Sequence, residues 1–183
     1  MRPSLMESFF APPMPFHPEE LYKHIRHLEQ VYNAIPPTDG NARTAMAKAI
    51  ISATASFVEG CVDDLITFTL AAVGVPPPIL EWVKGRRRLR GLDDKIQLLK
   101  SVLAGLRAGW QVKESPASQF IEGPMPDNKP GLRQLRNKVD HGSVVEQADL
   151  RVDRVAEFRI LACEYLVQVY ASMNVGTPGW LRN

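Results

Sequence analysis

Residues 41–73 read NARTAMAKAIISATASFVEGCVDDLITFTLAAV, and this stretch determines the fold that we expect. Its apolar residues recur at the three- and four-residue spacing of an α-helix, on two sides of that helix. Met46, Ile50, Ala53, Phe57, Cys61, Leu65 and Phe68 form one stripe, and Ile51, Val58, Val62, Ile66 and Val73 form the other. A helix that is apolar on two sides is central in a bundle.

The remaining face of this helix is polar and carries Ser52, Ser56, Glu59 and Asp63 at helical spacing. A face that meets water is the ordinary pattern and is the interpretation that we favour. The alternative is that these side chains line a polar groove.

Fifteen prolines divide the rest of the chain. Because a proline inside a helix costs about 3 kcal/mol, helices are expected in the stretches between them. The apolar spacing there predicts further helices over about 19–35, 92–108 and 149–173. Asp93 and Asp94 are expected to cap the second of these.

No strand pattern with alternating faces is present, so we predict an all-α protein. Its fold would be a bundle of four long helices plus a short helix before residue 141. The expected parts are a proline-rich arm at 1–18, the helical domain at 19–175 and a tail, a coil or small anchor, at 176–183. Residues 79–83 are expected to form a short turn, and residues 109–130, with four prolines, a long loop.

The composition favours one soluble domain, with 183 residues, 45% hydrophobic and 23% charged. Cys61 and Cys163 lie in apolar helical patterns and are expected to be buried thiols, which fits a reducing cytoplasm. We found no membrane-length apolar run and no signal peptide pattern, so a cytoplasmic protein without a membrane partner is expected.

His24 and His27 are three residues apart, but no third ligand is evident, so solvent-facing or partner-facing side chains are favoured over a metal site.

Residues 131–142 read GLRQLRNKVDHG and carry the candidate chemistry. Arg136 offers a positively charged fork that suits a phosphate, and His141 has a side chain that exchanges protons near neutral pH. Positions five apart on a helix point roughly 140° away from each other. Arg136 and His141 could therefore meet only if the helix ends between them, with Gly142 just past its end, or if two chains each supply part of one site. Asn137 lies four residues before His141 and could orient the ring or bind the phosphate.

The plain alternative for this motif is structural. Arg136 and Asp140 are four residues apart and could form a surface ion pair, while His141 could interact with the helix dipole.

The run LRNKVDHG resembles the Arg-Asn-(three residues)-His signature of HEPN-domain ribonucleases. The resemblance covers roughly residues 19–173, although only the motif is specific. It implies a HEPN-like bundle, a symmetric homodimer with a composite site, and a role in a toxin–antitoxin, phage-defence or stress-response system with an antitoxin as a further partner. Members of the family often place a polar or acidic residue of the second helix near the site, which makes Glu59 a substrate-orienting candidate.

The function that we expect is metal-independent endoribonuclease activity without a cofactor. His141 would handle the proton of the 2′-OH or of the leaving oxygen, and Arg136 would stabilise the charge on the phosphate, leaving a 2′,3′-cyclic phosphate and a 5′-OH. A non-catalytic module that binds RNA, a nucleotide or a protein is the alternative.

A basic run at residues 84–90 is a second candidate for RNA contact. The net charge of +2 is too small to indicate nucleic-acid binding, so such binding needs local clustering of cations. The candidate RNA-binding residues are Lys84, Arg86, Arg87, Arg88 and Arg90, together with Lys138 in the motif. A solvated loop, or a docking site for an acidic partner, is equally compatible with this run.

Overall fold

The computed structural model of this chain describes residues 17–85, 91–123, 125, 129–141 and 155–182. These residues form helices and no strand, so the protein is all-α over the part that the structure describes. The helices are α1 (Pro18–Ala34), α2 (Gly40–Ala72), α3 (Pro77–Gly85), α4 (Leu92–Gly105), α5 (Pro116–Glu122), α6 (Leu132–Asp140) and α8 (Val155–Ser172), followed by the short 3-10 helix η5 (Gly179–Leu181).

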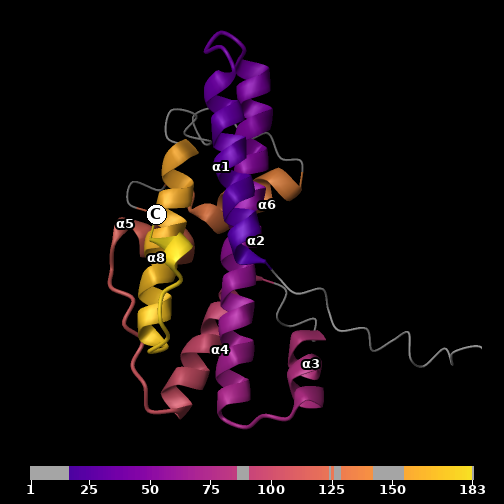
Figure 1. The fold of residues 1–183 in the computed structure, drawn as a ribbon. Coiled ribbons are helices and arrows are strands. Elements are labelled where there is room, and N and C mark those ends of the chain that lie inside the picture. The colour runs from indigo at the N-terminus through magenta and orange to yellow at the C-terminus, as the bar shows by residue number, and fades with distance from the viewer. Residues whose placement is uncertain (1–16, 86–90, 124, 126–128, 142–154, 183) are drawn as a thin grey trace, which may run out of the picture.

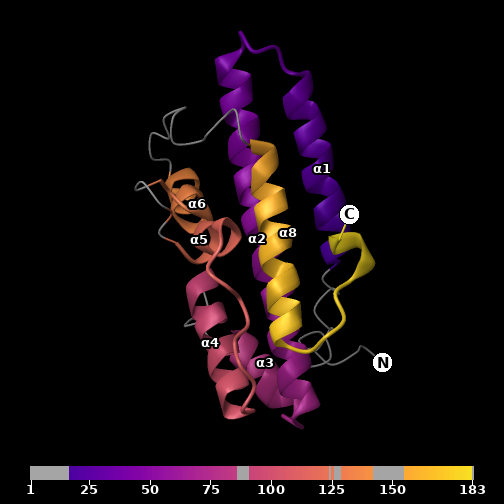
Figure 2. The ribbon, with the colours of Figure 1, turned by 90° about the vertical axis from the view of Figure 1, so that its left-hand side faces the viewer.

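Helix α2 is the central element, as its two apolar stripes predicted. It contacts α1, α3, α4, α6 and α8. Figure 1 shows α3 and α4 beside the C-terminal end of α2, and Figure 2 shows α8 running along it, with α1 on one side and α5 and α6 on the other. The N-terminus of α2 is capped by Asp39, whose side chain accepts a hydrogen bond from the Ala42 amide at 3.0 Å.

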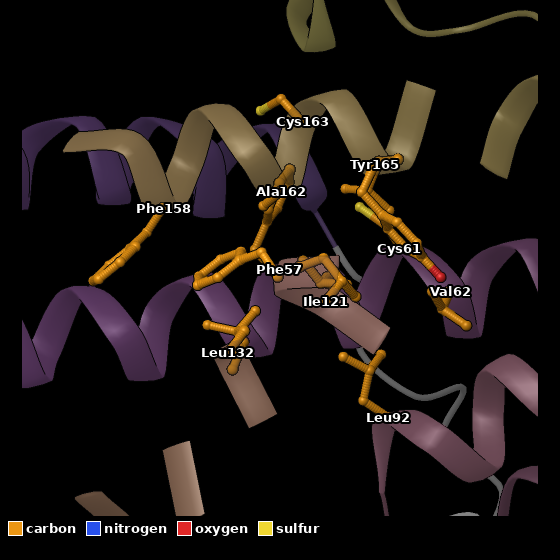
Figure 3. Packing of buried hydrophobic residues seen from close by; sticks show 14 of the residues in the cluster. Phe57, Cys61, Val62, Leu92, Ile121, Leu132, Phe158, Ala162, Cys163 and Tyr165 are labelled. Carbon is orange, nitrogen blue, oxygen red and sulfur yellow. The ribbon is translucent and has the colours of Figure 1, made fainter. Parts of the chain in front are cut away.

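The core forms where α2 meets α8 and the short helices. Figure 3 shows Phe57 and Cys61 of α2 packed near Ala162 and Tyr165 of α8, with Leu132 of α6 close by. These side chains are buried, and Phe57, Ala162, Tyr165 and Leu132 have no exposed surface. The apolar stripes of α2 are not buried at its C-terminal end. Phe68 and Val73, which were predicted to belong to them, are 56% and 47% exposed.

The long helices lie close to their predicted positions. Pro18 occupies the first turn of α1 and is followed by Glu19 and Glu20, which favour the positive end of the helix dipole. Helix α8 begins at Val155 in the structure, and residues 149–154 of its predicted span lie outside the described residues.

Two short helices were missed. Residues 79–83 belong to α3 rather than to a turn, and the predicted loop at 109–130 contains α5. Helix α5 begins with a capping box, in which the Ser115 amide donates to Ser118 Oγ at 2.9 Å and the Ser118 amide donates to Ser115 Oγ at 3.2 Å. Pro116 occupies the first turn of α5, where a proline starts a helix instead of breaking one.

The predicted cap of α4 was wrong. Gly91 is its N-cap and makes no side-chain cap, while Asp93 and Asp94 lie in the first turn, where they favour the helix dipole. The helix ends at Gly105, and Leu106, predicted to be in its apolar stripe, is 45% exposed.

The C-terminal tail is anchored. The Trp180 ring lies 5.9 Å from the ring of Tyr22 and 6.0 Å from that of Phe57, measured between centroids. These ring contacts fit a small anchor, which is one of the two alternatives expected for the tail.

By length and composition, α2 could also span a membrane, since one 18-residue window has a mean hydropathy of 1.3. Half of that window is buried inside the protein, and the core helix of a soluble protein passes the same test.

Candidate functional site

Helix α6 presents the motif, and its apolar side holds it against the core. Leu132 and Leu135 are fully buried and Val139 is partly buried, as predicted. The helix contacts α2 and α5. Its N-cap, Gly131, donates its amide hydrogen to Gln134 Oε1 at 2.9 Å.

Gly131 also brings α6 unusually close to α5. A Cβ at this position would lie 2.7 Å from the carbonyl oxygen of Phe120, which is near the end of α5. Only glycine allows the two backbones to approach this closely.

Arg136 points from α6 toward α2 and is held by two carboxylates. Its Nη1 donates to Oε1 of Glu59 on α2, and its Nε donates to Oδ2 of Asp140 at 3.2 Å. The side chain of Glu59 is 14% exposed and that of Asp140 is 48% exposed. The ion pair with Asp140 is the structural alternative weighed for this motif, and it is present.

Arg136 and Glu59 line an open cavity of about 340 Å³ between α2, α6 and the start of α4. Asn137 lines it too, so three of the four predicted site residues come together. The other lining residues are Ala55, Gly91, Leu92, Asp93, Asp94, Leu132, Arg133 and Asp140. The charged lining residues are four carboxylates and two arginines, and Arg133 forms an ion pair with Asp93.

His141 is not among the residues that line this cavity. It follows the last residue of α6 and is exposed, and its amide donates to the carbonyl oxygen of Asn137 at 3.0 Å. The helix thus ends between Arg136 and His141, as one of the two predicted routes requires. Because the backbone of His141 still makes a helical hydrogen bond, its side chain leaves α6 on a different side from Arg136. Gly142, the other part of that route, lies outside the described residues.

Two carboxylates of the polar face of α2 form ion pairs with neighbouring helices. Besides Glu59, its Asp63 accepts a hydrogen bond from Lys95 Nζ of α4 at 2.6 Å. Ser56 is exposed. The favoured interpretation of a solvated face was therefore wrong for Glu59, which lines the groove of the alternative, whereas Asp63 is 42% exposed and does not line it.

The predicted RNA contacts remain predictions. Lys138 is half-buried on α6, and Lys84 lies in the last turn of α3. Arg86, Arg87, Arg88 and Arg90 lie outside the described residues.

The two histidines of α1 and the two cysteines do not line this cavity. His24 and His27 are both exposed on α1, and no group of three potential metal ligands occurs within the described ranges. Cys61 and Cys163 are buried free thiols, as predicted. Burial raises the pKa of Cys163 to about 11 and raises that of Cys61 as well, so neither has the character of a nucleophile.

The role of Asp93 and Arg133 in forming this cavity was not predicted from the sequence. Arg133, Arg136, Asn137 and Asp140 recur at spacings of three and four, so their common face on α6 was visible in the sequence. The approach of Asp93 was not visible there, because it depends on how α4 and α6 each pack on α2.

A scan against protein-family models, a search of curated proteins and a search of solved structures each returned no match.

Proposed function

We propose that this protein is a metal-independent endoribonuclease of the HEPN type, acting as a homodimer. The observation that carries the proposal is the arrangement of α6. It directs Arg136 and Asn137 into an open cavity and ends directly before an exposed His141. An arginine for a phosphate and a histidine for a proton are what 2′-OH attack on RNA requires.

The two side chains act from different subunits. Within one chain Arg136 faces α2, whereas His141 is exposed at the end of α6 and outside the cavity. A two-fold axis near α6 would bring the histidine of one subunit to the arginine of the other, which forms two equivalent sites. Glu59 then serves to hold Arg136 in place, and Asn137 to orient the substrate.

The first test measures RNA cleavage in excess chelator. Arg136→Ala and His141→Ala should each abolish cleavage, with unchanged far-UV circular dichroism and unchanged mass in solution. Arg26→Ala and His24→Ala are matched controls, because both side chains are exposed on α1, and they should retain full activity. Full activity in both motif variants would remove the catalytic assignment.

The second test locates the two residues in different subunits. When Arg136→Ala and His141→Ala chains are mixed and allowed to exchange, about half of the dimers combine one chain of each kind. In a composite site, each such dimer has one intact site of two, so about a quarter of wild-type activity returns. If each site used residues of one chain only, every site in the mixture would lack one of them, and no activity would return.

The competing function is a non-catalytic binding module, which the pairing of Arg136 with two carboxylates favours. Induced expression separates the two. A toxin nuclease arrests growth and the His141→Ala variant relieves the arrest, whereas a binding module does neither.

A further inference from the structure

The contacts of Arg136 suggest how a substrate phosphate reaches it. A guanidinium group can hold a phosphate through either of two edges, each made of two nitrogen atoms that share Nη2. Glu59 takes the Nη1 end of one edge, and Asp140 takes the Nε end of the other. In the free protein both edges are therefore engaged by carboxylates, and a phosphate has to displace one of them.

The two carboxylates are not held equally. Glu59 comes from α2, is 14% exposed, and would be left as a nearly buried charge without a partner if Arg136 moved away. Asp140 lies four residues further along the same helix and is 48% exposed, and within the described residues it accepts one side-chain hydrogen bond, from Arg136 Nε at 3.2 Å. Exposed pairs of this spacing contribute little stability, since water replaces the lost contact. Asp140 is the carboxylate that a phosphate can displace.

The position of Asp140 in α6 gives a second reason to single it out. It is the last residue of the helix, where the negative end of the helix dipole disfavours a carboxylate. Helix formation does not account for an aspartate here, but the contact with Arg136 does.

We propose that Asp140 occupies the phosphate-binding edge of Arg136 in the free protein and is a built-in competitor of the substrate. The ligand class is the phosphodiester of a single-stranded nucleic acid. Asp140 swings away when the phosphate binds, while Glu59 keeps the guanidinium in place. This inference rests on the proposed function in placing a phosphate at Arg136, but it concerns binding and not the cleavage step.

The test compares the affinity of wild type and Asp140→Asn for a single-stranded oligonucleotide with 2′-deoxyribose. This probe lacks the 2′-OH and cannot be cleaved by 2′-OH attack, so binding is measured alone, by fluorescence anisotropy at low salt. Removing the competitor and its charge should tighten binding on the order of threefold to tenfold, and added salt should reduce the gain.

Asp94→Asn is the matched control. Asp94 lines the same cavity, and its carboxylate is not one of the two that hold Arg136. The control removes the same charge from the same cavity and should tighten binding by less than about twofold. In an Arg136→Ala background, Asp140→Asn should give no gain, because the competition acts through the guanidinium.

Three results would overturn the proposal. The first is that Asp140→Asn binds the probe no more tightly than wild type, which includes the case in which neither protein binds it. The second is an equal gain in affinity in Asp94→Asn, and the third is a gain from Asp140→Asn that persists in the Arg136→Ala background. Failure of the nuclease assignment is a separate outcome. The gain in binding would then be seen in a protein that cleaves no RNA.

Discussion

Gly131 should be sensitive to substitution, because a Cβ at this position would make a contact too short for real Cβ atoms. In Gly131→Ala the new Cβ would lie 2.7 Å from the Phe120 carbonyl oxygen, whereas Cβ contacts below 3.0 Å essentially never occur and ordinary contact begins at 3.4 Å. The backbones of α5 and α6 must therefore separate by about 0.3–0.7 Å, from 3.0 or 3.4 minus 2.7. Both atoms in the clash are fixed to backbone, so no flexible side chain can relieve it. Overpacking of this kind costs about 1–3 kcal/mol.

The assay is urea unfolding followed by far-UV circular dichroism. Gly131→Ala should lower the midpoint without changing the slope, as expected for a loss of stability alone. Gly105→Ala is the matched control, because it makes the same substitution in the last turn of α4, where a Cβ meets nothing within 4 Å. Alanine is a better helix former than glycine, so the control should be neutral or more stable by up to about 1 kcal/mol. A Gly131→Ala protein as stable as wild type would refute the close packing of α6 on α5.

Two further predictions concern buried groups. The Nε–H of Arg159 in α8 is shared between the two carboxylate oxygens of Glu29 in α1, at 3.0 and 3.1 Å. Arg159→Met should therefore cost about 3 kcal/mol at neutral pH, because it leaves a buried carboxylate without this partner. Burial already raises the pKa of Glu29 above 4.5 even with Arg159 present, and a raised pKa means that ionisation weakens folding. The loss in Arg159→Met should therefore shrink as the pH falls toward 4.5, and equal losses at acidic and neutral pH in urea unfolding would contradict this. Cys163, with its pKa raised to about 11 by burial, should react with a thiol reagent at neutral pH far more slowly in the native protein than in urea. Equal rates would show an exposed thiol.

The long helices could be predicted because their signals are local. The apolar spacing of α1 and α2, and the proline at the start of α1, depend only on neighbouring residues and were interpreted correctly. Other prolines led to wrong predictions at α3 and α5, where a turn and a loop were expected. A proline in the first turn of a helix and a proline in a loop have the same local signal, and packing against the body decides between them.

Only part of the candidate site could be predicted from the sequence. The spacing of Arg136, Asn137 and Asp140 placed them on one face of a helix, and the end of that helix before His141 was one of two predicted routes. The approach of Asp93 to Arg133 depends on how α4 and α6 each pack on α2. No local pattern encodes such a contact.

The sequence by itself determined that this chain is helical, which stretch is central and which faces are apolar, because periodicity and the fixed turn of 100° per residue are properties of neighbouring residues. Only the tertiary structure decided which charged side chains pair between different helices. Glu59 and Arg136 are 77 positions apart in the chain, and they meet because burial of Leu132 and Leu135 seats α6 on α2. The hydrophobic effect that brings the helices together has no direction of its own, so the final pairing of charges depends on how the side chains of the core pack.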